Sequence, residues 1–342
     1  ISGVNTIDVR GRVQMNLLDF GALGRARRAQ SAARASQADA VSAAEQAAAL
    51  AATAYLRVQR ADAQLAARLA DSVLADSLLL IARDQLAAGV GVALDVTRAE
   101  AQVATVRAQL IAARNERNRT RLDLLRALGL PLDAPVQLSD SLSTLPVADT
   151  LPSEAAAMER ARRSRPDLRA AEAQLAAAQQ SVHAVKSERL PSISAFGDEG
   201  WIGINMSHLL NTYTWGVQLS IPIFDGLRRE GRIEEQQALV RELSVRRRDL
   251  QQQVAIQVRA ALLDLASARE QLDAARERLR LTQQEVAQAQ DRFRTGVAGN
   301  ADVITASFDL NNARTLLVDA LTAYHSARVA LAQAEGAVTE LP

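Results

Sequence analysis

The sequence predicts a mainly helical protein with a smaller β portion, built from two long antiparallel helical hairpins in tandem. The clearest evidence is the segment from Gly226 to Gly336, which contains no proline. Its glycines lie near its two ends and at a turn around residues 296–300. A run of good helix formers whose breakers are confined to one turn is expected to form a helical hairpin.

The arms of this hairpin are predicted to be unusually long. The outgoing arm covers about 65 to 70 residues, which corresponds to about 100 Å at the helical rise of 1.5 Å per residue. Helices in ordinary globular domains average about 11 or 12 residues. We therefore interpret the arm as a strut and not as a core helix.

The same plan occurs earlier in the chain, between Gly21 and Gly129. Gly89 parallels Gly296 as the glycine of the turn, and it is as far from Gly129 as Gly296 is from Gly336. Both returning arms repeat apolar residues or alanine in steps of three and four, which specifies coiled-coil packing. An internal duplication of this kind outweighs any short motif.

Two segments alternate between apolar and polar residues, 6–17 and 212–222. Period two predicts β-strands with one apolar face. A half-buried sheet of an α+β protein and a transmembrane barrel are both compatible with it. A further strand is expected from Ser192 through Phe196 onward, followed by a loop that holds Gly197, Gly200, Gly203 and Asn211.

The chain divides into three predicted parts. Residues 1–129 form the first repeat, and the repeat pattern leads us to expect another helix and strand before Ile1. Residues 130–165 form a connector with four of the eight prolines and a short helix, 154–164, capped by Ser153. Residues 166–342 form the second repeat, which begins with a helix opened by Pro166.

Composition excludes several classes of function. The 342 residues are 48% hydrophobic and only 3% aromatic, and the net charge is +1, so no overall field favours nucleic acid. The longest apolar stretch is far shorter than the roughly 20 residues of a membrane-spanning helix. There is no cysteine, and the three histidines lack ligand spacing. We expect no metal, no cofactor and no catalytic residues.

Two aspartates occupy equivalent places in the two repeats. Asp95 and Asp302 each lie six residues after the glycine of their turn, at the start of a returning helix. Acidic residues there complement the helix dipole. In a symmetric assembly they could also form rings at the mouth of a pore, where they would attract cations.

At this point the chain resembles the outer membrane efflux protein family, the TolC-like channels. Single motifs are weak, but their ordered duplication covers essentially the whole chain. The resemblance rests on these segments: 220–226, 292–297 with 302–303, their weaker copies 18–21 and 88–90 with 95–96, and 165–168.

The resemblance implies a homotrimer in the outer membrane that extends into the periplasm. Four strands per chain would close a twelve-stranded transmembrane β-barrel, continuous with an α-helical periplasmic tunnel. The channel would be the passive exit of a tripartite efflux pump or of a type I secretion system, conducting drugs, small molecules or proteins. Its partners would be a periplasmic adaptor (membrane fusion) protein, an inner-membrane transporter and outer membrane lipid, with no nucleic acid.

The resemblance also implies site residues. The hairpin turns would dock the adaptor through Gly89, Val90, Gly296 and Val297. Asp302 matches an acidic pore constriction, in which Thr305 occupies the next acidic position. Phe293 and Ala298 correspond to the tyrosine and arginine that tether the closed entrance, and Asp95 to its aspartate, so most of that latch is missing. The lipid-facing residues would be Ile7, Val9, Val13, Met15, Tyr213, Trp215, Val217 and Leu219.

Physical reasoning supports a trimer independently. Four strands cannot close a barrel, since single-chain barrels begin at about eight, and an open sheet edge in lipid leaves costly unsatisfied backbone groups. Two alternatives remain open. A periplasmic adaptor would have one hairpin with lipoyl-like and small barrel modules, and a coiled-coil scaffold would leave the apolar strand faces unexplained.

Overall fold

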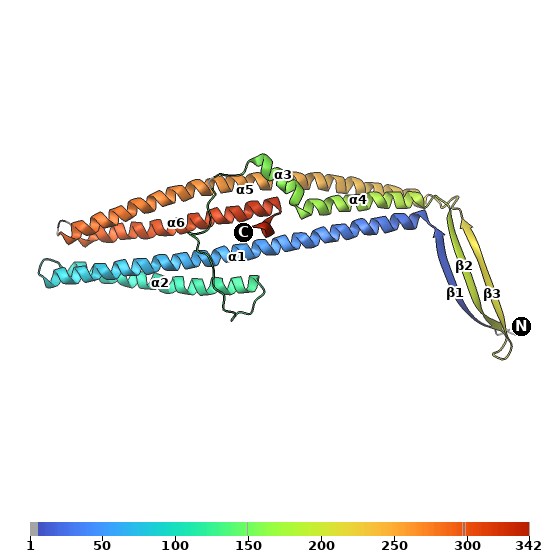
Figure 1. Ribbon diagram of the computed structural model, residues 1–342, viewed down its shortest axis with the longest axis horizontal. Coiled ribbons are helices and arrows are strands. Elements are labelled where there is room, and N and C mark those ends of the chain that lie inside the picture. The colour runs from blue at the N-terminus through green and yellow to red at the C-terminus, as the bar shows by residue number, and fades with distance from the viewer. Residues whose placement is uncertain (1–5, 149, 296, 298, 342) are drawn as a thin grey trace. The chain divides into compact units, whose positions relative to one another are not determined.

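The computed structural model describes residues 6–148, 150–295, 297 and 299–341 (Figure 1). Long helices dominate, together with one small antiparallel sheet, which confirms the predicted mainly helical fold class with its two hairpins. The elements are β1 (Ile7–Leu18), α1 (Phe20–Ala87), α2 (Ala93–Ala127), α3 (Glu154–Ser164), α4 (Pro166–Ser187), β2 (Ser192–Gly203), β3 (Leu209–Ser220), α5 (Arg228–Arg294), α6 (Asn300–Glu335) and a 3₁₀ turn (Val338–Glu340).

The two hairpins are close copies in length. Helix α1 has 68 residues and α5 has 67, while the returning helices α2 and α6 have 35 and 36. In Figure 1 each long helix runs beside its returning partner up to a short turn. The predicted arm of about 65 to 70 residues is therefore confirmed for both copies.

The chain forms two compact units that cut across the order of the sequence. One consists of residues 1–41 and 166–252 and contains the sheet, α4 and the first turns of α1 and α5. The other consists of residues 42–165 and 253–342 and contains the hairpin turns, α2, α3 and α6. Each predicted repeat thus contributes to both units.

The sheet has the strand order β1-β2-β3, and both pairings are antiparallel. Strand β1 lies within one residue of its predicted bounds. The predicted loop was wrong, because Gly197, Gly200 and Gly203 lie inside β2 and Asn211 lies inside β3. These glycines do not make a turn.

The physical reason is close backbone approach within the sheet. A Cβ atom at Gly200 would come within 2.2 Å of the carbonyl oxygen of Val9, and one at Gly203 within 2.1 Å of that of His208. A glycine inside a strand often marks such a site. Sequence alone could not distinguish this role from that of a loop residue.

The connector and the short helices follow the sequence prediction. Helix α3 has the predicted bounds, and the side chain of Ser153 accepts a hydrogen bond from the backbone N–H of Ala156 at 3.3 Å. Pro166 is the first residue of α4. The described residues between α2 and α3 contain neither helix nor strand.

The interior of the helical part is a thin seam and not a thick core. In α6 the seam consists of the apolar and alanine positions that recur in steps of three and four from Val303 to Ala334, and all of them are buried except Leu317, which is half-buried. The seam of α2 is less complete, since Ala127 is exposed. Alanine fills much of both seams because it allows helix backbones to approach closely. Among the described residues, none of the helices combines the length and the apolarity that crossing a membrane requires.

Candidate functional site

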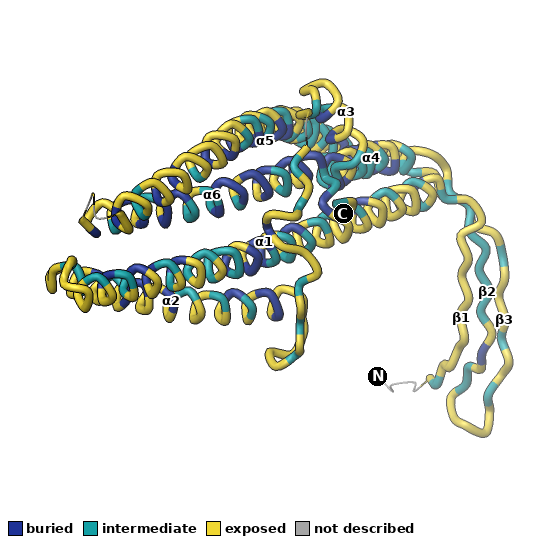
Figure 2. Tube along the Cα trace, turned by 60° about the vertical axis from the view of Figure 1, so that its left-hand side comes forward, coloured by how far each residue is buried: buried dark blue, intermediate teal, exposed yellow. Residues whose placement is uncertain are grey.

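The sheet gathers apolar side chains on one of its faces. Directly paired residues share a face, and the register pairs Val13 with Gly197 and Gly197 with Trp215. The alternating positions of β1 and β3 therefore lie on the same side. Figure 2 shows β1 and β3 exposed along most of their length. The large exposed apolar residues of this face are Val9, Val13, Met15, Trp201, Tyr213, Trp215, Val217 and Leu219.

Two residues of β2 also contribute side chains to this face, which the alternation of β1 and β3 does not predict. Trp201 of β2 pairs with Val9 and so joins the apolar set, 50% exposed. Glu199 pairs with Tyr213 and with Gly11, which places one carboxylate on the same face. Ile7, which was predicted to face lipid, is the first residue of β1 and is half-buried, whereas the rest of the strand is exposed.

The opposite face of the sheet is polar and charged. Nε of Arg10 donates to Oδ1 of Asp8 at 2.7 Å, and Nη1 of Arg10 lies 3.6 Å from Oδ1 of Asp198. The ring of Phe196 covers Gly216, whose added Cβ would meet it at 3.1 Å. A sheet with one apolar and one charged face is suited to separate hydrocarbon from water.

The first hairpin turn is a helix-terminating motif that requires glycine. Gly89 has φ +74°, the left-handed region that other residues rarely adopt. Its N–H donates to the carbonyl of Leu86 at 3.0 Å, and the N–H of Val90 donates to that of Gln85 at 3.1 Å. This pair of bonds is a Schellman motif, and it leaves the side chain of Val90 exposed.

The second turn exposes an equivalent valine. The N–H of Val297 donates to the carbonyl of Arg292 at 2.9 Å, and the side chain of Val297 is exposed. Gly296, which was predicted to dock the adaptor, and Ala298, which occupies the position of the missing latch arginine, lie outside the described residues. The structure thus places Val90 and Val297 on the surface of the two turns.

The two predicted aspartates have different surroundings. The side chain of Asp302 is 56% exposed, and its Oδ2 lies 3.9 Å from Nη1 of Arg292. Thr305, one turn along α6, is also exposed and donates its hydroxyl to the carbonyl of Ala301 at 3.0 Å. The side chain of Asp95 is only 16% exposed. Asp302 and Thr305 therefore share an exposed face of α6, whereas Asp95 is largely covered.

Phe293, which the resemblance also implies for the pore constriction, is buried in this structure. Its side chain is 3% exposed and packs with Leu78 of α1 and Val303 of α6. The ring therefore fills the seam between the hairpins and offers no surface to a passing solute. The constriction role of Phe293 stays a prediction.

Two neutral hydrogen bonds join the hairpins near their turns. Nδ2 of Asn300 donates to the carbonyl of Asp95 at 2.7 Å, and Nε2 of Gln85 donates to the carbonyl of Phe293 at 3.1 Å. Sequence reasoning missed Asn300 and Gln85, since an amide that binds a backbone carbonyl more than 200 residues away leaves no periodic signal.

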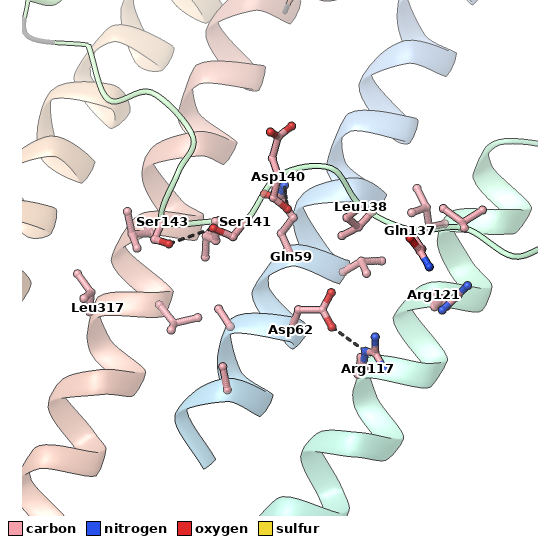
Figure 3. A pocket seen from close by; sticks show the side chains of 18 residues that line it. Gln59, Asp62, Arg117, Arg121, Gln137, Leu138, Asp140, Ser141, Ser143 and Leu317 are labelled. Carbon is pink, nitrogen blue, oxygen red and sulfur yellow. Dashed lines mark hydrogen bonds and ion pairs between the residues drawn. The ribbon is translucent and has the colours of Figure 1, made fainter. Parts of the chain in front are cut away.

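A cleft of about 760 Å³ lies between α1, α2, α6 and the connector (Figure 3). Nε of Arg117 donates to Oδ1 of Asp62 at 2.7 Å across it, and Nε2 of Gln59 donates to the carbonyl of Asp140 at 3.4 Å. These contacts tie α2 and the connector to α1. Among the described residues, His, Asp and Glu side chains form no group of three or more that could hold a metal ion.

An amphipathic sheet and two tandem helical hairpins with an exposed aspartate near one turn define the class of the protein, which has a TolC-like fold. The chain belongs to the outer membrane efflux protein family, whose model matches residues 3–130 and 157–337. Proteins of this family are transport channels and not enzymes, in agreement with the class predicted from the sequence.

Relatives and solved structures agree with this assignment. The chain is 28% identical over 243 residues to the antibiotic efflux pump outer membrane protein ArpC of Pseudomonas putida, and this alignment covers 67% of this chain and 48% of ArpC. The chain thus spans about half the length of the curated relatives it matches. Its fold matches the outer-membrane channel OprN (TM-score 0.79, 19% identity, 97% of this chain and 81% of OprN). It equally matches the open state of the MtrE channel of Neisseria gonorrhoeae (TM-score 0.79, 18% identity, 97% and 80%).

Proposed function

We propose that this chain is the outer membrane exit channel of a tripartite efflux pump and acts as a passive conduit from the periplasm outward. The observation that carries the proposal is the sheet, whose apolar face suits hydrocarbon and whose charged face suits a water-filled lumen. The similar proteins ArpC and TtgC, named as efflux pump outer membrane proteins, support the same function.

The channel would be a homotrimer. Among the described strands, β1 and β3 each pair only with β2, so each has an edge without a partner strand. Open edges are not tolerated in lipid because every unsatisfied backbone group there costs several kcal/mol. Other copies of the chain would complete these edges in a twelve-stranded barrel, four strands per copy, of which the described residues supply three.

The helical hairpins would form a tunnel that crosses the periplasm and meets a periplasmic adaptor at the turns. The exposed Val90 and Val297 and the obligatory glycine at 89 supply a small, apolar docking surface. Gly296 belongs to this proposed surface by analogy with Gly89. An inner-membrane transporter would provide the energy, since a conduit has no chemistry of its own.

The entrance of the tunnel would select for charge. Asp302 and the neighbouring Thr305 lie on one exposed face of α6, and a symmetric assembly would arrange three copies of them around the pore. A ring of carboxylates attracts cations and repels anions. Asp95 is largely covered and would contribute less to such a ring.

The proposal is tested by the state of the native protein. We expect it to be extracted from membranes only with detergent, and to appear by electron microscopy as a three-fold particle with a narrow tubular extension. Purified particles should also produce ion-conducting channels in planar bilayers. A monomer that is stable in detergent-free buffer would contradict the proposal, because the apolar sheet face would then need no cover.

A further inference from the structure

Helices α1 and α6 meet around a carboxylate that is removed from water. The side chain of Asp71 on α1 is 0% exposed. Nη1 of Arg68 lies 3.1 Å from its Oδ2, and Nη1 of Arg314, on α6, donates to its Oδ1. Both arginines are more than three-quarters buried themselves. One negative and two positive charges are thus held between the first and the second hairpin.

Two further residues of α6 complete this group. With its nitrogen turned toward the carboxylate, the amide of Asn311 donates to Oδ2 of Asp71 at 3.1 Å and to the carbonyl of Ser307 at 3.2 Å. Nη2 of Arg68 donates to the hydroxyl of Thr315 at 3.1 Å. We name these five residues the Asp71 node: Arg68, Asp71, Asn311, Arg314 and Thr315.

The node resists separation of the two helices more than the other contacts between them. A buried carboxylate is tolerated only while its partners remain in place, and removal of one partner leaves an uncompensated charge. By contrast, the pair between Arg60 and Asp319, which joins the same two helices at 2.7 Å, is 46% and 43% exposed. An exposed pair of this kind exchanges its partner for water at little cost.

We propose that Asp71 is a positioning residue for the channel entrance, and this rests on the proposed function. The node holds α6 against the first hairpin about three turns from Asp302. It thereby fixes the radius at which Asp302 and Thr305 surround the pore. A displacement of α6 away from α1 would pull Arg314 and Asn311 from the carboxylate.

The described residues nearer to the turns give weaker ties between the two hairpins than the node does. Phe293 cannot replace the tethering tyrosine, because its ring is buried and has no hydroxyl. The amide bonds of Asn300 and Gln85 near the turns are neutral and end on backbone carbonyls. The charged contact with the greatest burial between α1 and α6, within the described part of the chain, is that of Asp71.

The test compares variants of the full protein in planar bilayers, by single-channel conductance and by reversal potential in a salt gradient. In Arg314→Gln the carboxylate keeps Arg68 and the amide of Asn311 but loses its charged partner on α6. We expect its conductance to rise about twofold or more and its cation preference to fall about twofold, because the acidic ring widens. Asp71→Asn should behave in the same way. Asp319→Asn is the matched control on the same helix pair and should conduct like the wild type.

A conservative replacement distinguishes a positioning role of the node from a contribution to stability alone. Arg314→Lys keeps a positive charge on α6 and should restore a conductance and selectivity near those of the wild type. If Arg314→Gln and Asp71→Asn unfold at lower temperature while their folded trimers conduct as the wild type does, the node is only structural and the inference is overturned. Should Asp71→Asn not fold, Arg314→Gln decides alone. A wild type that forms no channel would instead contradict the proposed function.

Discussion

His325 should make the helical part of the protein lose stability at acidic pH. Its side chain is 3% exposed, and it lines a small cavity of about 120 Å³ together with Tyr55, Pro146 and Arg328. Within the described structure, its Nε2 has no hydrogen-bond partner. Burial, and secondarily the positive charge of Arg328, lowers the pKa of His325 to about 4 from its ordinary 6.5.

The sign and the size of the effect follow from this shift. Because the pKa in the folded state lies below that of the unfolded state, the unfolded chain binds more protons between pH 6.5 and about 4. Stability is therefore complete above pH 6.5, falls as the pH decreases through this window, and stops changing on this account below pH 4. At 1.36 kcal/mol per pKa unit, the loss amounts to about 3 kcal/mol.

The measurement is guanidinium unfolding followed by far-ultraviolet circular dichroism between pH 7.5 and pH 4. His325→Gln removes this titration and leaves every carboxylate in place, so the difference between wild type and variant isolates the histidine. That difference should change by about 3 kcal/mol over the window. A wild-type-minus-variant difference that is constant from pH 7.5 to pH 4 would refute the reasoning.

Three further predictions concern the pore, the sheet and the connector. Asp302→Ala should weaken cation selectivity, and unchanged reversal potentials would rule out its role in the constriction. Trp215→Arg should reduce the yield of assembled protein in the membrane, because an arginine facing lipid costs about 2 to 4 kcal/mol at mid-depth. The control Gln218→Arg, on the opposite face of β3, should assemble normally. Equal yields of the two variants would contradict the assigned faces. Tyr324→Phe removes the hydroxyl that accepts from the N–H of Ala148 at 2.9 Å and should lower the free energy of unfolding by about 1 kcal/mol, whereas unaltered unfolding would mean that water replaces this bond.

Much of the fold was readable because its signals are local. A helix ends where glycine adopts a left-handed φ, and it readily begins with proline, because the N–H of the first residue has no partner in the helix. Gly89 and Gly336 therefore located the ends of α1 and α6, and Pro166 located the start of α4. The alternation of β1 likewise depends only on successive residues. Such patterns repeat with the period of one helix turn or one strand step and need no knowledge of the rest of the chain.

Only the tertiary structure decided which residues share a face of the sheet and which side chains are buried. Strand β2 brings the apolar sides of β1 and β3 to one face, because it pairs with β3 nearby in the chain and with residues of β1 that lie 175 to 196 positions away. The burial of Phe293, the glycines inside β2 and the carboxylate of Asp71 between two arginines also depend on contacts between distant segments. The sequence by itself determined the helices, the strand alternation and the family resemblance. Packing determined which residues are buried. The burial of a side chain depends on its neighbours in space, and the periodicity of the sequence does not specify those neighbours.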